Sequence, residues 1–360
     1  MQKKLIALAV ASIVSAPAFA QSNVTIYGVL DAGVESIKYS DSVGSLTRMF
    51  TSGNTTNRFG FKGSEDLGNG MKANFVLEMQ PYPDVGTAGS ATAGNGNLWH
   101  RTSTIGLSGN SWGSVNLGSQ YTPWFSARAS NDIFYTAGVA SNYTVTEAQN
   151  TRMSNSIRYD SVSMNGFTVA AMYGFGQAGG YDTQEGTTAA NKNVGQDTGL
   201  WLNYANGPLA LRYGYDHYKV SQGPDVVNKA NWLGGSYDFK VVKLVAGWGS
   251  RKNDASPAAT IDNKSWYVGG VLPIGANDLV KAQYNALKDN TATAATGSKD
   301  LKMFALGYEH FMSKRTTLYA NYAKITNDQG AAGTFLSDNA VAVAAGYDPS
   351  AFQVGVKHSF

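Results

Sequence analysis

The stretch S-A-F-Q-V-G-V-K-H-S-F, residues 350–360, alternates between two kinds of side chain. One parity is small or polar, and the other is mostly apolar and consists of Phe352, Val354, Val356, His358 and Phe360. A period of two predicts a β-strand whose two faces meet different surroundings. Taken alone, this strand fits either the edge of a soluble sandwich or the closing strand of a barrel whose apolar side meets lipid.

Residues 24–35 repeat this two-sided pattern. Ile26, Leu30 and Val34 share one face, and the carboxylates of Asp31 and Glu35 share the other. Two carboxylates on one face of a strand require water on that side. Residues 58–62 and 71–80 alternate in the same way, so an apolar exterior around a wet lumen explains all of these strands.

Sixteen candidate strands follow from the same alternation. They lie near residues 24–35, 58–62, 71–80, 98–109, 113–121, 152–160, 166–176, 196–206, 208–219, 228–239, 241–252, 262–273, 278–288, 299–312, 315–326 and 349–360. Seven short connections alternate with eight long ones, which lie near 38–53, 81–97, 122–151, 177–195, 220–227, 253–261, 289–298 and 327–348. This alternation is typical of outer-membrane barrels, whose short turns face the periplasm and whose long loops face outward. The sequence therefore predicts an all-β fold, a 16-stranded antiparallel transmembrane β-barrel, because a soluble sandwich has no reason to place every long loop at one end.

Residues 1–20 have the three parts of a secretory signal peptide. Lys3 and Lys4 form the positive start, residues 5–14 are apolar, and A-F-A at 18–20 is a small-x-small cleavage site. The apolar part is shorter than the roughly 18–20 residues that a spanning helix needs. We therefore expect cleavage before Gln21, export of the chain, and one barrel domain over residues 21–360.

The charge and cysteine content exclude several kinds of site. Without residues 1–20, which hold two lysines and no acid, the chain has 26 basic and 25 acidic residues and a net charge of about +1. This balance provides no polybasic surface for nucleic acid. The chain contains no cysteine, which excludes disulfides and thiolate chemistry, and no metal-ligand spacing is visible. We expect no nucleic-acid partner, no cofactor and no metal.

Several short motifs, taken in their order along the chain, resemble one known family. They are N-R-F-G-F-K-G-S-E-D-L-G-N-G at 57–70, G-L-S-G at 106–109, N-S-I-R-Y at 155–159, S-K-R-T at 313–316 with L-Y-A at 318–320, and G-V-K-H-S-F at 355–360. The set resembles the general porins of Gram-negative bacteria, of the β-proteobacterial type, from about residue 22 to the last. The resemblance implies a homotrimer in the lipid bilayer of the outer membrane, passive diffusion of small hydrophilic solutes and ions, and a third long loop folded into the lumen. It also implies that the assembly machinery reads Phe360.

The third long loop, residues 122–151, is rich in aromatic residues. It contains Trp124, Phe125, Phe134, Tyr135 and Tyr143, which are too many for a freely solvated loop. Folding this loop into the barrel would bury some of these rings against the wall and narrow the pore. The alternative is a loop that packs on the outer mouth.

Six charged residues are candidates for the pore constriction. They are Arg58, Arg101, Arg152, Arg158, Asp132 and Glu147. The resemblance places a basic cluster on the wall that faces the inward loop, and Arg58 and Arg158 match the family motifs best. Asp132 and Glu147, from the loop, would lie opposite and create a transverse field.

The sequence supports some of these arginines as members of the basic cluster more than others. Arg152 shares the polar parity of its strand, whereas Arg101 has the apolar-face parity of Ile105 and Leu107, which counts against it. Ser119 stands where the family often carries arginine. The alternative is that these charges are scattered over the lumen or paired locally at the rim.

We expect a weak anion preference, because guanidinium groups stay charged at all relevant pH values. The charges with lumen parity are the cations Arg58, Lys62, Lys72, Arg152, Arg158, Arg212, Lys243 and Lys281 and the acids Asp31, Glu35, Glu78, Asp216 and Asp238. Two other readings stay open, namely a substrate-selective channel and, as a different class, a barrel hydrolase or an adhesion barrel. The four histidines fall near strand ends and indicate no catalytic group, so no enzymatic activity is expected.

Overall fold

The computed structural model describes residues 23–40, 44–89, 98–145, 150–176, 194–222, 225–254, 260–291, 293, 296–335 and 343–360. The expected signal peptide at residues 1–20 lies outside the described residues. None of the helices in the described part combines the length and apolar character that crossing a bilayer requires.

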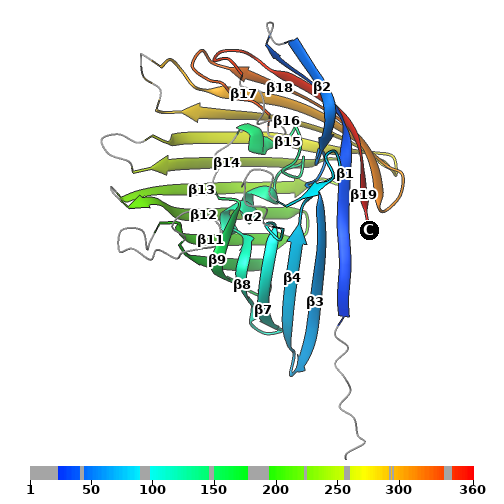
Figure 1. Ribbon diagram of the computed structural model, residues 1–360, viewed down its shortest axis with the longest axis vertical. Helices are drawn as coiled ribbons and strands as arrows, with labels where there is room; N and C mark the ends of the chain where they lie inside the picture. The colour runs from blue at the N-terminus through cyan, green and yellow to red at the C-terminus, as the bar shows by residue number, and fades with distance from the viewer. Residues whose placement is uncertain are drawn as a thin grey trace, which may run out of the picture.

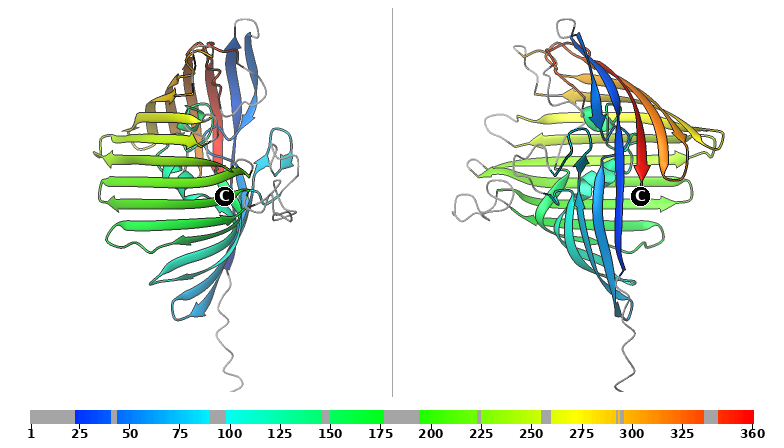
Figure 2. Two further views of the ribbon diagram at one scale, coloured as in Figure 1. Left: turned by 90° about the vertical axis from the view of Figure 1, so that its left-hand side faces the viewer. Right: turned by 45° about the vertical axis from the view of Figure 1, so that its right-hand side comes forward.

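Sixteen antiparallel strands form one closed ring, as the alternation predicts. Successive members pair along the chain, and β19 pairs with β1 to close the ring. The members are β1 (Asn23–Ser40), β3 (Arg58–Gly68), β4 (Met71–Met79), β7 (Thr102–Gly109), β8 (Gly113–Tyr121), β9 (Arg152–Asp160), β10 (Phe167–Phe175), β11 (Gln196–Asn206), β12 (Leu209–Gln222), β13 (Asp225–Asp238), β14 (Lys243–Asn253), β15 (Asp262–Ile274), β16 (Asp278–Asp289), β17 (Leu301–Phe311), β18 (Thr316–Asn327) and β19 (Ser350–Ser359). Figure 1 shows these strands in order around the ring, and both views of Figure 2 show β1 and β19 side by side.

One further strand lies beside β1, where a loop was expected. The other edge of β1 pairs first with β3 and then, in its second half, with β2 (Gly44–Thr51). The prediction of a long loop over residues 38–53 is therefore wrong. The alternation continues through this region, since Ile37 and Tyr39 are buried and Met49 is exposed, and β2 ends where residues 52–57 leave the wall.

A second expected loop is much shorter than predicted. β12 continues to Gln222 and β13 begins at Asp225, with these two residues opposite each other. The prediction of a long loop at 220–227 is therefore wrong, because valines at 220, 226 and 227 suit a strand and extend both partners. Within the expected loop at 81–97, β5 (Pro81–Tyr82) and β6 (Thr87–Ala88) form a small separate ribbon.

The barrel wall has two different faces, as the parity predicts. On β19, Val354 is 42% exposed on the outer face, while the adjacent Gln353 is 0% exposed. On β1, Ile26 is 59% exposed, whereas Asp31 is 0% exposed. An outward apolar band suits lipid, and the closed ring gives every strand two hydrogen-bonding partners in a medium without water.

Residues 122–151 are called L3 from here, and their described part folds into the barrel as predicted. The described part contains α2 (Pro123–Ala129) and the 3-10 helix η1 (Asn142–Val145). Figure 1 shows α2 against β12 and β13. The buried apolar cluster joins L3 to the lumen side of the strands, which excludes a loop packed only on the outer mouth. It includes Trp124, Ala127, Phe134 and Val139 of L3 and Ala230, Trp232, Met303 and Ala305 of the wall.

The start of α2 follows from its local sequence. Thr122 is the N-cap, and its hydroxyl accepts a hydrogen bond from the Phe125 N–H at 3.2 Å. Pro123 occupies the first turn, where its missing N–H has no intrahelical partner to lose. Trp124 and Ala127, three residues apart on one face, are both buried. The short helix therefore presents one apolar face to the wall.

Candidate functional site

Glycines on the wall allow L3 to approach closely. A Cβ atom at Gly199 of β11 would lie 2.7 Å from Pro123 Cδ, and one at Gly214 of β12 would lie 2.8 Å from Ala127 Cβ. Real Cβ atoms essentially never make contacts this short, so glycine at these positions admits the helix without displacing it. The helix α2 therefore sits directly on the lumen side of β11 and β12.

Hydrogen bonds hold the rest of L3 to strands farther round the ring. The Tyr267 hydroxyl of β15 donates to the Asn131 carbonyl at 2.7 Å. The Val139 N–H donates to Gln353 Oε1 of β19 at 3.2 Å. L3 thus crosses the lumen side of the strands from β11 to β19, which we call the covered wall. The open wall consists of β3, β4, β7, β8 and β9, at the edge of L3.

A buried ion pair holds the tip of L3 to the covered wall. The side chains of Lys281 on β16 and Glu309 on β17 are 2% and 1% exposed and form a salt bridge. Lys281 Nζ lies 4.0 Å from the ring centroid of Tyr135 in L3. Asn54 Nδ2 donates to Glu309 Oε1 at 2.6 Å. Because both charges are out of water, each depends on the other for its stability.

Residues 52–57, between β2 and β3, fold inward beside the tip of L3. The buried carboxylate of Asp31 accepts hydrogen bonds from the N–H groups of Asn54 and Thr55 at 2.7 and 2.6 Å. A Cβ atom at Gly138 of L3 would lie 2.2 Å from the Gly53 carbonyl oxygen, so the two segments are in direct contact. The sequence interpretation missed this segment, although the run N-T-T-N at 54–57 includes two asparagines, which are depleted in strands.

Asp132 lies inside L3 and is 5% exposed. Its carboxylate accepts hydrogen bonds from Ser141 Oγ at 2.6 Å and from the N–H groups of Phe134 and Thr136 at 2.9 and 3.1 Å. Burial raises the pKa of the Asp132 carboxyl above its usual range, although these donors and the charge of Arg128 act in the opposite direction. Asp132 therefore stabilises the fold of L3 itself.

Arg128 is a second buried charge of L3. Its Cζ atom lies 4.2 Å from the ring centroid of Tyr143 and 5.7 Å from those of Trp124 and Trp232. Its Nη2 donates to Asn142 Oδ1 at 3.2 Å. These cation–π contacts join the two arms of L3 and attach them to β13.

On the open wall, Arg101 and Arg152 converge on Tyr121 at the end of β8. Arg101 Nη2 and Arg152 Nη2 donate to the Tyr121 hydroxyl oxygen at 2.8 and 2.6 Å. Arg101 Nε also forms a salt bridge with Glu78 Oε1 at 2.7 Å, and the Tyr27 hydroxyl donates to the other oxygen of Glu78 at 3.0 Å. The structure therefore brings two of the predicted arginines together through a tyrosine that the sequence interpretation missed.

The parity argument against Arg101 does not apply. β7 begins at Thr102, so Arg101 precedes the strand, and its guanidinium reaches Glu78 and Tyr121 on the neighbouring strands. Parity predicts direction only within an extended strand. The sequence signal for Tyr121 is its position directly before the T-P pair at 122–123, where α2 begins and the chain leaves the wall.

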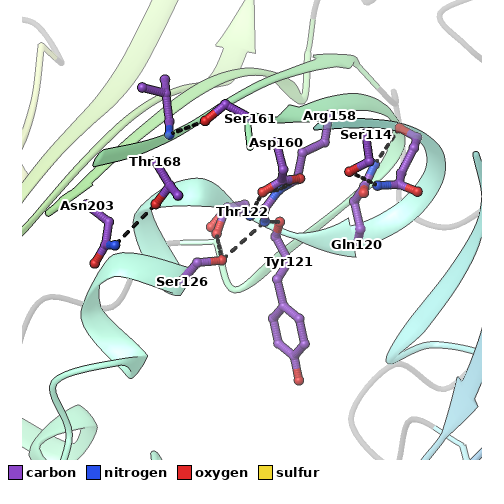
Figure 3. A network of polar contacts seen from close by, with 12 residues as sticks. Ser114, Gln120, Tyr121, Thr122, Ser126, Arg158, Asp160, Ser161, Thr168 and Asn203 are labelled. Atoms are coloured by element: carbon purple, nitrogen blue, oxygen red, sulfur yellow. Dashed lines mark hydrogen bonds and ion pairs between the residues drawn. The ribbon is translucent and has the colours of Figure 1, made fainter. Parts of the chain in front are cut away.

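Arg158 on β9 is bound to an acid of its own strand. Its Nη2 and Nε atoms donate to Asp160 Oδ1 and Oδ2 at 2.7 and 2.9 Å, which is a bidentate pair. Its Nη1 atom donates to the Tyr121 carbonyl at 2.7 Å and to Ser126 Oγ of α2 at 3.1 Å. Figure 3 shows this side chain between Asp160 and the start of L3. Arg158 therefore attaches L3 to the open wall, with its charge balanced by Asp160.

Arg58 and Lys62 lie on β3 of the open wall. Arg58 makes two long hydrogen bonds of 3.4 Å, to the Thr56 carbonyl and to Thr55 Oγ1. The Lys62 side chain is exposed, and its Nζ atom lies 5.0 Å from the ring centroid of Tyr27. Among the described residues, neither cation forms a salt bridge with a carboxylate.

The six predicted constriction residues thus fall into three groups. Arg101, Arg152 and Arg158 meet at Tyr121, and Arg58 lies on the same open wall. The described hydrogen bonds of Asp132 stay within L3 and include none of these arginines. Glu147 lies outside the described residues. Within the described part of the chain, no group of three or more histidine, aspartate or glutamate side chains could hold a metal ion.

Comparisons with known proteins agree with this architecture. A family model described as Gram-negative porin matches residues 7–330. The outer membrane porin protein 32 of Delftia acidovorans is 33% identical over 371 residues, which cover 100% of both chains. An outer membrane porin protein of Bordetella pertussis is 30% identical over 90% of this chain and 94% of its own. The solved structure of an anion-selective porin from Comamonas acidovorans is 30% identical, covers 94% of this chain and 100% of its own, and superposes with a TM-score of 0.81.

Proposed function

The chain belongs to the Gram-negative porin family and forms a water-filled outer-membrane channel for passive diffusion of small hydrophilic solutes and ions, and we propose that this channel prefers anions to cations. The charges of the open wall support this preference. The acids Glu78 and Asp160 on this wall are each bound to an arginine. Arg58 and Lys62 add positive charge that no carboxylate among the described residues balances by a salt bridge.

The described part of L3 places little negative charge opposite this wall. Asp132 is buried and hydrogen-bonded within the loop, so its carboxylate does not face the water of the lumen directly. We assign Arg58, Arg101, Arg152 and Arg158 to the basic side of the constriction. The similarity to a porin described as anion-selective supports the same direction.

The test is the reversal potential of single channels under a KCl gradient. We expect the wild-type channel to favour chloride. The preference should fade at 1 M salt, because the screening length is about 10 Å at 0.1 M salt but only about 3 Å at 1 M. The double variant Arg58→Ser with Arg158→Ser should shift the potential toward zero. A wild-type channel that favours potassium, or no shift in the double variant, would contradict the proposal.

We propose further that the chain acts as a homotrimer after export and removal of residues 1–20. The family resemblance supports the trimer, and the charge and apolar pattern of residues 1–20 supports the signal peptide. Light scattering in mild detergent should give three chains per particle, and mass spectrometry should find a mature chain that begins at Gln21. A monomeric particle would contradict the trimer, and an uncut chain would contradict the signal peptide.

We also propose that Phe360 is a recognition signal for barrel assembly. Its N–H and carbonyl pair with Gly28 at 3.1 and 3.2 Å, while its ring stays 44% exposed on the outer face. Phe360→Ser should reduce the amount of barrel in the outer membrane, whereas Phe352→Ser, on the same face and 49% exposed, should reduce it much less. Equal amounts of the two variants in fractionated membranes would refute this role.

A further inference from the structure

Tyr121 occupies the point where L3 leaves the barrel wall. It is the last residue of β8, and the next residue, Thr122, caps α2. One side of its ring lies against Arg152, with 4.3 Å from the guanidinium Cζ to the ring centroid. The ring also stacks on Phe125 of α2 at 5.2 Å with an interplanar angle of 11°. The side chain of Tyr121 is therefore fixed between an arginine and the inward loop.

The two oxygen atoms of Tyr121 accept hydrogen bonds from three arginines. Its hydroxyl oxygen accepts from Arg101 Nη2 and Arg152 Nη2 at 2.8 and 2.6 Å, and its carbonyl accepts from Arg158 Nη1 at 2.7 Å. Two guanidinium groups that share one acceptor repel each other, and the negative end of the phenol dipole offsets part of this repulsion. The hydroxyl thus keeps two cations close together that would otherwise separate.

The two arginines depend on this hydroxyl to different degrees. Without it, Arg101 keeps its salt bridge with Glu78 at 2.7 Å. Of the described hydrogen bonds of Arg152, only the one from Nε to the Arg101 carbonyl, at 2.7 Å, would remain. Arg152 is therefore the side chain whose position would change most.

We propose that Tyr121 is a positioning residue for ion selectivity, which acts by holding the guanidinium of Arg152 beside Arg101 at the edge of L3. The inference rests on the proposed anion preference of the channel. It adds a neutral aromatic side chain to the residues that would set the selectivity. The stacking on Phe125 makes this position depend on the docking of L3 as well.

The experiment compares Tyr121→Phe with the wild type in single-channel recordings under a KCl gradient. Phenylalanine keeps the ring contacts with Arg152 and Phe125 and removes only the shared acceptor. We expect the chloride-to-potassium permeability ratio to fall by a factor of about two to three, because one hydrogen-bond acceptor rather than a charge is lost. Open-channel current noise should rise, since Arg152 gains mobility beside the permeation path.

Two further variants separate positioning from a general effect on the fold. Tyr213→Phe removes a hydroxyl that donates to Asn231 Oδ1 at 2.8 Å on the outer face, and it should leave the permeability ratio unchanged. In an Arg152→Ala background, Tyr121→Phe should change the ratio less than it does in the wild type, because coupled residues are non-additive. Equal changes in both backgrounds, or an unchanged ratio in Tyr121→Phe, would overturn the inference. A wild-type channel that prefers potassium would instead contradict the proposed function. That result comes from the wild-type recording alone, so it is distinguishable from a failure of the inference, which the variants test.

Discussion

The covered wall and the open wall carry the same kinds of charged side chain in different surroundings. On the covered wall, Lys281 and Glu309 are almost fully buried beneath the tip of L3 and bind each other. On the open wall, Lys62 is exposed and Arg58 makes only two long hydrogen bonds. Both lysines point to the inner side of the barrel, yet only one of them meets water.

This difference separates two functions of charge in one barrel. A buried pair interacts strongly because little solvent screens it, but it is already neutralised and adds little to the field in the pore. An exposed cation is screened over about 8–10 Å at 0.1–0.15 M salt, which still reaches ions that pass close to it. We infer that the buried charges of the covered wall hold L3 in place, whereas the exposed cations of the open wall act on solutes.

The largest expected effect comes from breaking the buried pair on the covered wall. Lys281→Met leaves the charge of Glu309 buried without its partner and should reduce the free energy of unfolding by about 3–5 kcal/mol. Lys252→Met is the matched control, because the Lys252–Asp262 pair is exposed and should contribute only about 0–1 kcal/mol. Urea unfolding of the two variants in detergent measures both values. Similar losses in the two variants would show that burial does not distinguish the pairs.

An intermediate effect is expected from single changes on the open wall. Arg58→Ser should lower the chloride-to-potassium permeability ratio by a factor on the order of two to five, because it removes a charge that no described carboxylate balances. Arg158→Ser should lower it less, since Asp160 already neutralises that guanidinium. Asp160→Asn should raise the ratio for the same reason. Reversal potentials under one KCl gradient rank all three variants, and a larger effect of Arg158→Ser than of Arg58→Ser would reverse this assignment.

The smallest effect concerns Asp132 and the pH dependence of L3 docking. Because burial raises the pKa of Asp132, docked L3 binds a proton more tightly than a detached, solvated loop would. Docking is therefore most favourable below the usual aspartate pKa of about 3.9 and weakens as the pH rises through the raised pKa, by at most about 1.4 kcal/mol per pH unit. Open-channel noise should increase with pH over this window in the wild type and stay flat in Asp132→Asn. Noise that decreases with rising pH would refute the sign.

Much of the site could be predicted from the sequence, but its connections could not. The inner-face parity of Arg58 and Arg158 holds in the structure. The parity that Arg152 shares with Arg158 does not hold, because β9 shifts its register against β8 between Met153 and Ser156. Arg101 was judged by the parity of β7, but this strand begins only at the next residue, Thr102. Tyr121 was missed because its importance comes from contacts with residues on two other strands and in L3, which no local pattern reveals.

The sequence by itself determined the sixteen strands of the ring and the inner and outer faces of their regular parts, although it missed β2 and the short connection between β12 and β13. These features follow from a period of two in the side chains and from the need to pair every backbone group in lipid, and both are local or general constraints. The tertiary structure alone decided which inner-face charges meet water. L3 crosses the strands from β11 to β19 and buries Lys281, while Lys62, with the same parity, stays exposed. Solvent exposure depends on packing between segments far apart in the chain, so residues of identical pattern can differ in screening, energy and function.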